Sequence, residues 1–272
     1  MQRSSYDFDS FEDRSAEARH LAARAQDGLS NFIPTLKSSG LTATMRVLDV
    51  GSGTGDRALA LAKFLRSGEV VGIDRSQDLI TSAAALVAKK KCQNLTLEVA
   101  DVFAPSSLKP LGRFDFIHMR LVLQHLQEPV QALKNLRSLL VPGGTIFVED
   151  TDRAWMTVVP PVDGWEPLYL RIQKGQAALG GDPYSGRKLA WYLAQAGFEQ
   201  VTTKLHPVTG GREQVLAWVE HYAPSYLNFL PLRQRPAARK LLDRIKTEAE
   251  AQAMFFHQVW FQATGLRGEA KK

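Results

Sequence analysis

The sequence predicts an α/β fold built on a mainly parallel sheet. Short apolar runs alternate with helical segments through most of the chain, which is typical of parallel strands joined by helices. The first apolar run ends in the glycine-rich turn "GSGTG" at 51–55, where backbone can approach a ligand closely. Two segments, 151–185 and 209–252, fall outside the alternation, and we interpret both as insertions that cover one edge of the sheet.

Composition is that of an ordinary globular protein. The 272 residues are 44% hydrophobic, and the single cysteine, Cys92, excludes an intrachain disulfide. The N-terminus lacks the pattern of a signal peptide and no apolar run is long enough to span a membrane, so we expect a cytoplasmic protein. The net charge of +6 comes from residues 187–272, with 13 basic and 7 acidic side chains, which form either a solvated helix face or an anion-attracting surface.

Each element can be placed from its own pattern. Residues 15–38 are expected to form a helix with an apolar face through Leu21, Ala25 and Leu29, and Ser76 is a plausible N-cap. We predict strands at 45–50, 69–76, 94–103, 114–119 and 142–152, a helix–Gly197–strand unit at 186–208, and a last strand at 253–267. Helices are predicted at 56–65, 77–90, 129–140 and over most of 212–250, where Pro224, Pro231 and Pro236 interrupt the pattern.

Several polar residues stand where predicted strands end, and the carboxyl ends of parallel strands border a ligand crevice. These residues are Asp49 and Gly51 after the first strand, Asp74 after the second, Asp101 with Val102 and Phe103 after the third, and His118, Met119 and Arg120 after the fourth. An acid at the end of the second strand can accept from both hydroxyls of a ribose, which suits NAD and other adenosine ligands alike.

The glycine spacing argues against NAD. The dinucleotide pattern G-x-G-x-x-G/A does not match the sequence when it starts at Gly51. A match that starts at Gly53 begins two residues too late relative to the end of the strand. Asp56 would then stand beside a pyrophosphate, at a helix N-terminus that favours anions. Asp101 can instead accept from an exocyclic amine of adenine while the Val102 amide donates to a ring nitrogen. Together these features indicate an adenosine ligand without a pyrophosphate.

Five ordered motifs resemble the class I S-adenosylmethionine-dependent methyltransferases, of the small-molecule (UbiE-like) type: "VLDVGSGTGD", "GIDRS", "VADVF", "FDFIHMRLVLQHL" and "LLVPGGTIFVED". The resemblance implies a Rossmann-like, seven-stranded sheet with an antiparallel last strand, helices on both faces and a helical cap from the insertions. It also implies S-adenosyl-L-methionine as cofactor, S-adenosyl-L-homocysteine as product, and no metal. The implied cofactor residues are Gln26, Asp49, Gly51, Ser52, Gly53, Gly55, Asp74, Arg75, Asp101, Val102, Phe103, Met119 and Arg120.

Within that set, Asp74 would hold the ribose, Asp101 and Val102 would read the adenine, and the backbone near Met119 and Arg120 would border the sulfonium. Gln26 ends "EARHLAARAQ", which resembles a pattern that closes over the methionine end, although His20 displaces the usual arginine. The alternative for this helix is simple packing on the sheet. The expected units are an N-terminal helical lid (1–45), the cofactor-binding core (46–150 and 186–208), cap insertions (151–185 and 209–252), and the last core strand with a tail (253–272).

The sequence says less about the substrate that would accept the methyl group. A hydroxyl acceptor often needs a base, and the candidates are His125, His118, His221 and Tyr184, although His125 is also compatible with a structural role. The Asn/Asp-Pro-Pro-Tyr motif of amino-group methylation is replaced by "HMRL", and the insertions are rich in aromatic residues, which favours a small, partly apolar metabolite accepting at O, N or C. Arg233, Arg235 and Arg239 could add an anion-binding edge.

We expect a monomer or homodimer that does not bind nucleic acid. Two alternatives remain open at this stage: a non-methylating catalyst of cyclase or decarboxylase type that uses the same cofactor, and an RNA methyltransferase that uses the basic C-terminal region. A nicotinamide oxidoreductase is a more distant alternative.

Overall fold

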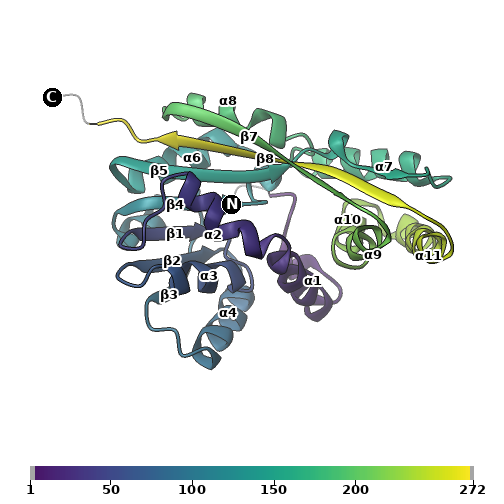
Figure 1. Cartoon of the computed structure of the whole chain (residues 1–272), viewed down its shortest axis with the longest axis horizontal. Coiled ribbons are helices and arrows are strands. Elements are labelled where there is room, and N and C mark those ends of the chain that lie inside the picture. The colour runs from purple at the N-terminus through teal and green to yellow at the C-terminus, as the bar shows by residue number, and fades with distance from the viewer. Residues whose placement is uncertain (1–3, 270–272) are drawn as a thin grey trace.

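A computed structural model describes residues 4–269. Residues 1–3 of the predicted lid and 270–272 of the predicted tail lie outside the described part. Five parallel strands form the centre of the sheet in the order β3-β2-β1-β4-β5 (Figure 1). They are β1 (Arg46–Val50), β2 (Glu69–Asp74), β3 (Leu95–Val99), β4 (Phe114–Arg120) and β5 (Leu140–Thr151).

The last strand, β8 (Phe255–Leu266), runs antiparallel to β5 on one side and to β7 (Glu199–Gly210) on the other. This arrangement confirms the Rossmann-like sheet with an antiparallel last strand. One strand was not predicted: the three-residue β6 (Thr157–Val159) pairs with the start of β8, beyond the point where β5 ends. Over residues 4–269, the sheet therefore has eight strands.

Helices cover both faces of the sheet, as expected. One core lies under α2 (Leu29–Ser38), α3 (Asp56–Phe64) and α4 (Gln77–Lys89), and the other under α5 (Pro105–Leu108), α6 (Pro129–Leu139) and α8 (Leu189–Gln195). The local signals explain the helix ends. Ser76 caps α4 by accepting from the Leu79 amide, and Pro129 occupies the first turn of α6, where its missing N–H is not needed.

The predicted single helix at 15–38 is wrong, because the chain forms two helices. α1 (Arg14–Gln26) ends before Gly28, which has a φ of +65° and starts α2 in a new direction. A left-handed residue cannot continue a right-handed helix, so the apolar face is divided. Leu21 and Ala25 of α1 line a cavity, whereas Leu29 of α2 packs against the sheet core.

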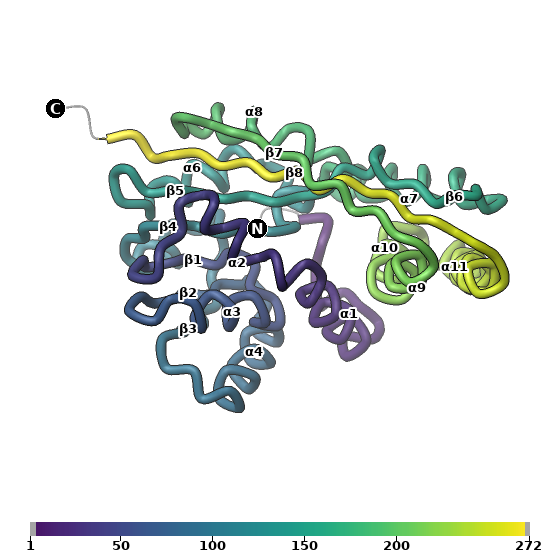
Figure 2. Tube along the Cα trace, in the orientation of Figure 1, coloured from purple at the N-terminus to yellow at the C-terminus, as the bar shows by residue number. Residues whose placement is uncertain are grey.

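A second group of helices lies beside the end of β7 and the start of β8 (Figures 1 and 2). It contains α7 (Trp165–Ala178), α9 (Arg212–His221), α10 (Ala223–Tyr226) and α11 (Arg235–Ala251). These helices share an apolar core of their own with the first residues of β8, and we call this unit the cap. Pro224 and Pro236 stand in the first turns of α10 and α11, so they begin helices rather than break them.

Short 3-10 turns join these elements: η1 (Phe8–Ser10), η2 (Lys109–Leu111), η3 (Leu123–His125), η4 (Arg153–Trp155), η5 (Gly186–Lys188), η6 (Leu227–Phe229) and η7 (Leu232–Gln234). None of the helices described over residues 4–269 is both long enough and apolar enough to cross a membrane.

Candidate active site

A cavity of about 230 Å³ lies at the carboxyl ends of the parallel strands. The N-terminal segment, α1 and the cap form its other walls. Of the predicted cofactor residues, the structure brings ten to this cavity: Asp49, Gly51, Ser52, Gly53, Asp74, Arg75, Asp101, Val102, Phe103 and Arg120. Residues from four neighbouring strands thus converge, because parallel strands place all their carboxyl ends at one edge of the sheet.

The turn after β1 is built for close approach by a ligand. Gly51 and Gly53 have φ values of +73° and +53°, which residues with a side chain rarely adopt. A Cβ on Gly51 would lie 2.5 Å from Val122 Cγ2, whereas a Cβ on Gly53 would meet nothing within 4 Å. Gly55 has a different task, since a Cβ there would lie 2.9 Å from Ala83 Cβ on α4, and the residue does not line the cavity.

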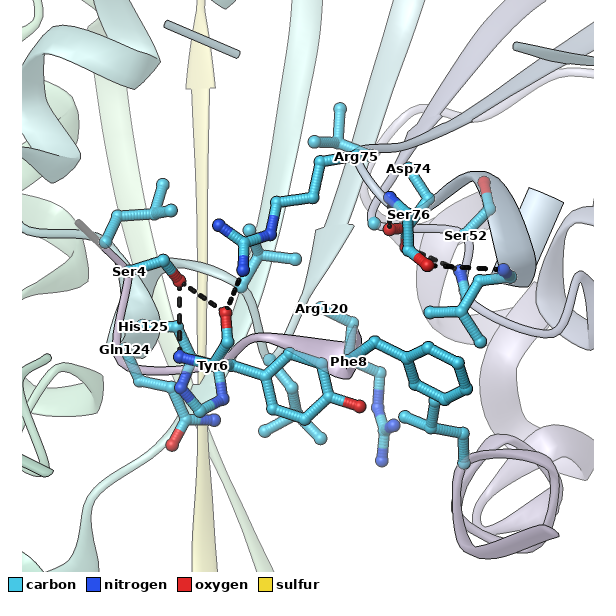
Figure 3. Close-up of a pocket in the computed structure, with 18 of the residues that line it drawn as sticks. Ser4, Tyr6, Phe8, Ser52, Asp74, Arg75, Ser76, Arg120, Gln124 and His125 are labelled. Carbon is cyan, nitrogen blue, oxygen red and sulfur yellow. Dashed lines mark hydrogen bonds between the residues drawn. The ribbon is translucent and has the colours of Figure 1, made fainter. Parts of the chain in front are cut away.

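Asp74 and Asp101 present carboxylates on neighbouring strand ends. Asp74 accepts from the Gly53 and Ser76 amides, both at 3.0 Å, and burial raises its pKa despite these bonds (Figure 3). Asp101 Oδ1 accepts from the Phe103 amide at 2.9 Å, and no partner for the Val102 amide occurs within residues 4–269. A diol can therefore donate to Asp74, and an adenine edge fits the second Asp101 oxygen with the Val102 N–H. These residues fit an adenosine ligand.

His118 of β4 lies beside Asp49 of β1 in the sheet register. Its Nδ1 is 2.7 Å from Asp49 Oδ1, and both side chains are almost completely buried. Phe32 meets the imidazole edge-on and Phe147 stacks on it, with centroid separations of 5.0 and 6.0 Å. His118 thus reaches the cavity, but its ring is fixed by a carboxylate and two aromatic neighbours.

Two further arginines lie close to this pair. Arg120 pairs with Glu149 at 2.8 Å and lies over the Trp260 ring, 4.4 Å from its centroid. Arg57 was not predicted as a site residue. Its Nη2 donates to the Asp27 carbonyl, its guanidinium lies over Phe32, and burial followed by repulsion from Arg120 lowers its pKa to about 10. This wall of the cavity therefore carries two guanidinium groups close to two carboxylates, those of Glu149 and Asp49.

The N-terminal segment crosses the cavity as a strap, which we define as residues 4–8 (Figure 3). Ser5 donates its amide to the His125 carbonyl at 2.9 Å, and its hydroxyl lies 2.9 Å from His125 Nδ1. Tyr6 packs its ring near His125 and donates its hydroxyl to Glu17 on α1 at 3.0 Å. Burial, followed by repulsion from Arg153, Arg24 and Arg75, lowers the pKa of His125 to about 3, so its imidazole is neutral near pH 7.

The cap contributes an aromatic wall next to His125. Tyr222, Tyr226 and Phe229 line the cavity, and Arg153 of η4 lies over the Tyr226 ring, 3.9 Å from its centroid. Three tryptophans of the two insertions do not line this cavity. Trp165 and Trp218 pack edge to face at 4.8 Å between centroids inside the cap core, and Trp155 is half exposed.

Five predicted site residues do not line the cavity. Gly55 packs against α4, as described above. Gln26 donates to Asp56 at 2.9 Å, and Met119 points into the core on the opposite face of β4. His221 ends α9, and Tyr184 donates to Gln173 at 2.7 Å. Arg235 and Arg239, predicted as part of an anion-binding edge, approach Glu12 instead.

Several cavity residues escaped the sequence reading, among them Tyr6, Arg24, Gln124 and Arg153. Arg153 had a usable signal, because it directly follows the predicted fifth strand. Tyr6 had none, since a strap has no periodicity. Within the part of the chain that the structure describes, no group of three or more His, Cys, Asp or Glu side chains could hold a metal ion.

Comparison with known proteins places this geometry in context. A family profile described as "Methyltransferase domain" matches residues 41–197, more than half of the chain. An uncharacterised methyltransferase of Schizosaccharomyces pombe is 28% identical over 184 residues, which cover 65% of this chain and 65% of that protein. The ubiquinone/menaquinone biosynthesis C-methyltransferase of Laribacter hongkongensis is 26% identical over 71% of this chain and 78% of its own length.

The match to the fission-yeast relative thus covers slightly less than two thirds of that protein's length. Among solved structures, a protein of Bacillus halodurans superposes with a TM-score of 0.60 at 19% identity, covering 88% of this chain and 99% of that chain. At this identity the likeness shows the fold.

Proposed function

The chain belongs to the class I S-adenosylmethionine-dependent methyltransferases, and on that premise we propose that it methylates a small, partly apolar metabolite. The observation that carries the proposal is the division of one cavity into two halves. Strand-end carboxylates and open glycine backbone form the first half, and aromatic side chains of the cap form the second. A cofactor and an acceptor bound in these halves would meet inside one cavity.

In the first half, we assign Asp74 to the ribose hydroxyls and Asp101 with the Val102 amide to the adenine. The backbone at Gly51 and Gly53 lies where the methionine part would pass, and Arg57 supplies positive charge for its carboxylate. When bound, S-adenosylmethionine supplies a methyl group activated by its sulfonium. The glycine turn then needs no side chain, because the contacts come from main-chain atoms.

In the second half, Tyr222, Tyr226 and Phe229 bury the acceptor and exclude water. Methyl displacement from a sulfonium depends mainly on alignment of the acceptor atom, so rigid aromatic walls are the principal contribution of the chain. His125 is neutral and lies at the junction of the strap, the cap and η3, where its ring can hydrogen bond to an acceptor. His118 is occupied by Asp49, and we assign it to holding that carboxylate. His221 and Tyr184 receive no role at the reacting atoms.

The test is transfer of isotope-labelled methyl. The protein is incubated with methyl-labelled S-adenosylmethionine and a small-molecule extract, and the products are separated from macromolecules. We expect label in a small molecule together with one S-adenosylhomocysteine per methyl transferred. Label in RNA would favour the RNA methyltransferase, and chemical change in a small molecule without loss of the labelled methyl would favour a non-methylating catalyst.

A further inference from the structure

Arg153 is a buried guanidinium without a carboxylate partner among the described residues. It begins η4 directly after β5, lines the acceptor half of the cavity, and is 3% exposed. Its Nε donates to Gln176 Oε1 at 2.7 Å, its planar group lies against Tyr226 and Phe229, and it also donates to the hydroxyls of Tyr226 and Tyr169. These partners are all neutral. Over residues 4–269, no carboxylate comes within ion-pair distance of it.

Three of the four other arginines that line the cavity have a carboxylate partner. Arg24 pairs with Glu17 at 2.5 Å, Arg120 with Glu149 at 2.8 Å, and Arg75 with Asp7 at 3.2 Å. One more, Arg57, also lacks a carboxylate partner, but it donates to a carbonyl and lies beside Asp49, on the cofactor side. In the acceptor half, Arg153 therefore carries the uncompensated charge.

The acids nearest to Arg153 in sequence are already engaged. Asp152 is held by Arg187 through two hydrogen bonds, one of them at 2.8 Å. Asp150 accepts from the Gln124 and Thr151 amides, and its burial raises its pKa to about 7, so it is only partly ionised near neutrality. Neither side chain supplies a full negative charge to the Arg153 guanidinium.

The depressed pKa of His125 reports the same positive potential from a second position. After burial, its causes are Arg153, Arg24 and Arg75, with no acid among them. A buried cation without a counter-ion is unfavourable, and a site that keeps one is poised for an anion. The aromatic rings beside it favour a ligand whose body is apolar.

We infer that the acceptor carries a carboxylate that pairs with Arg153, joined to an apolar body that packs on Tyr226 and Phe229. The inference rests on the proposed function, because that function assigns this half of the cavity to the acceptor. A planar guanidinium suits a carboxylate in a two-pronged pair. This half has one arginine without a carboxylate partner, and no lysine lines the cavity among residues 4–269, which matches a monoanion better than a phosphate dianion.

The experiment measures binding of matched acid and amide probes to the full chain saturated with S-adenosylhomocysteine. The probes are 3-phenylpropionate, 4-hydroxybenzoate and octanoate, each with its amide, together with phenyl phosphate. Variants are R153M, which removes the charge but keeps a long side chain, and R153K, which keeps the charge. R171M is the matched control, since Arg171 is an exposed residue of α7 outside the cavity.

We expect at least one acid to bind wild type and R171M about tenfold or more tighter than its amide, through its charge-assisted pair. R153M should abolish this preference, R153K should keep part of it, and affinity for S-adenosylhomocysteine should stay within about twofold. Equal binding or no binding of all acids and amides by wild type would overturn the inference, as would tighter binding of phenyl phosphate. Loss of S-adenosylhomocysteine affinity in R153M would instead assign Arg153 to the cofactor carboxylate. Failure of wild type to bind S-adenosylhomocysteine would count against the proposed function itself.

Discussion

Asp49 and His118 face each other across the adjacent strands β1 and β4, with 2.7 Å between Oδ1 and Nδ1. The second oxygen of Asp49 and the Nε2 of His118 have no hydrogen-bond partner among the described residues, and both are buried. The pair therefore depends on one hydrogen bond to keep a carboxylate in the sheet interior, at the edge of the cavity. Its removal has a predictable cost.

His118→Phe should lower the free energy of unfolding of the ligand-free protein by about 3 kcal/mol, because Asp49 would remain buried without a partner. In the double variant D49N/H118F, the loss should be smaller than the sum of the single losses by about 1–2 kcal/mol. Urea unfolding followed by circular dichroism measures all three variants. Strictly additive losses would mean that the two groups do not stabilise each other.

Gly53→Ala and Gly55→Ala should separate ligand binding from stability. At Gly53 the added methyl meets open cavity, so stability should fall by only about 1 kcal/mol, from the positive φ. Affinity for S-adenosylhomocysteine should fall more than tenfold, by about 1.4 kcal/mol or more. At Gly55 the methyl meets Ala83, and the main effect should be a lower melting temperature. A G53A variant that binds like wild type would show that no ligand passes this turn.

His125 should make the fold acid-sensitive. Its pKa falls from the ordinary 6.5 to about 3 on folding, so its stabilising contribution is present above about pH 6.5 and is lost as pH falls toward 3. The difference in free energy of unfolding between wild type and H125N should therefore decrease from about pH 7 to about pH 4. Chemical denaturation at several pH values measures it. If the difference in free energy of unfolding does not change with pH, the His125 ring is more solvated than its packing against the strap and the cap implies.

Asp150 should act in the opposite direction. Burial raises its pKa from the ordinary 3.8 to about 7, so the folded protein favours the neutral acid. That preference stabilises the fold at low pH and is lost as pH rises from about 4 to about 7. The melting temperature of wild type minus that of D150N should thus be larger at about pH 5 than at about pH 8. The reverse order would show that the carboxylate is better solvated than its 1% exposure indicates.

The sequence was sufficient to predict those parts of the site whose positions follow from where the strands end. Asp49, Asp74 and Asp101 stand at the ends of predicted parallel strands. Because the carboxyl ends of parallel strands lie at one edge of a sheet, the sequence pattern was enough to bring these residues together. The break at Gly28 escaped it, because one left-handed residue inside an apolar periodicity leaves little local trace. Met119 was named for its backbone at a strand end, and alternation along β4 directs its side chain into the core, so its predicted contact stays one of the main chain alone.

The residues that line the acceptor half of the cavity could not be predicted from local sequence patterns. Tyr226 and Trp218 look alike as aromatic residues of one insertion, but only the packing of the cap sends Tyr226 to the cavity and Trp218 to the interior. Tyr6 reaches the cavity through pairing of the strap with η3, more than 100 residues away in the chain. Such contacts are fixed by tertiary structure, and no spacing in the sequence encodes them.

The most direct test of the whole account is calorimetric titration of S-adenosylhomocysteine into wild type and Asp74→Ala. The account predicts one molecule bound per chain, and an affinity of D74A reduced by tens- to a hundred-fold, about 2–3 kcal/mol, because two ribose hydroxyls lose their acceptor. Asp243→Ala, which alters an exposed carboxylate on α11, should bind like wild type. A D74A affinity within about twofold of wild type would contradict the central claim that the strand-end carboxylates hold the cofactor.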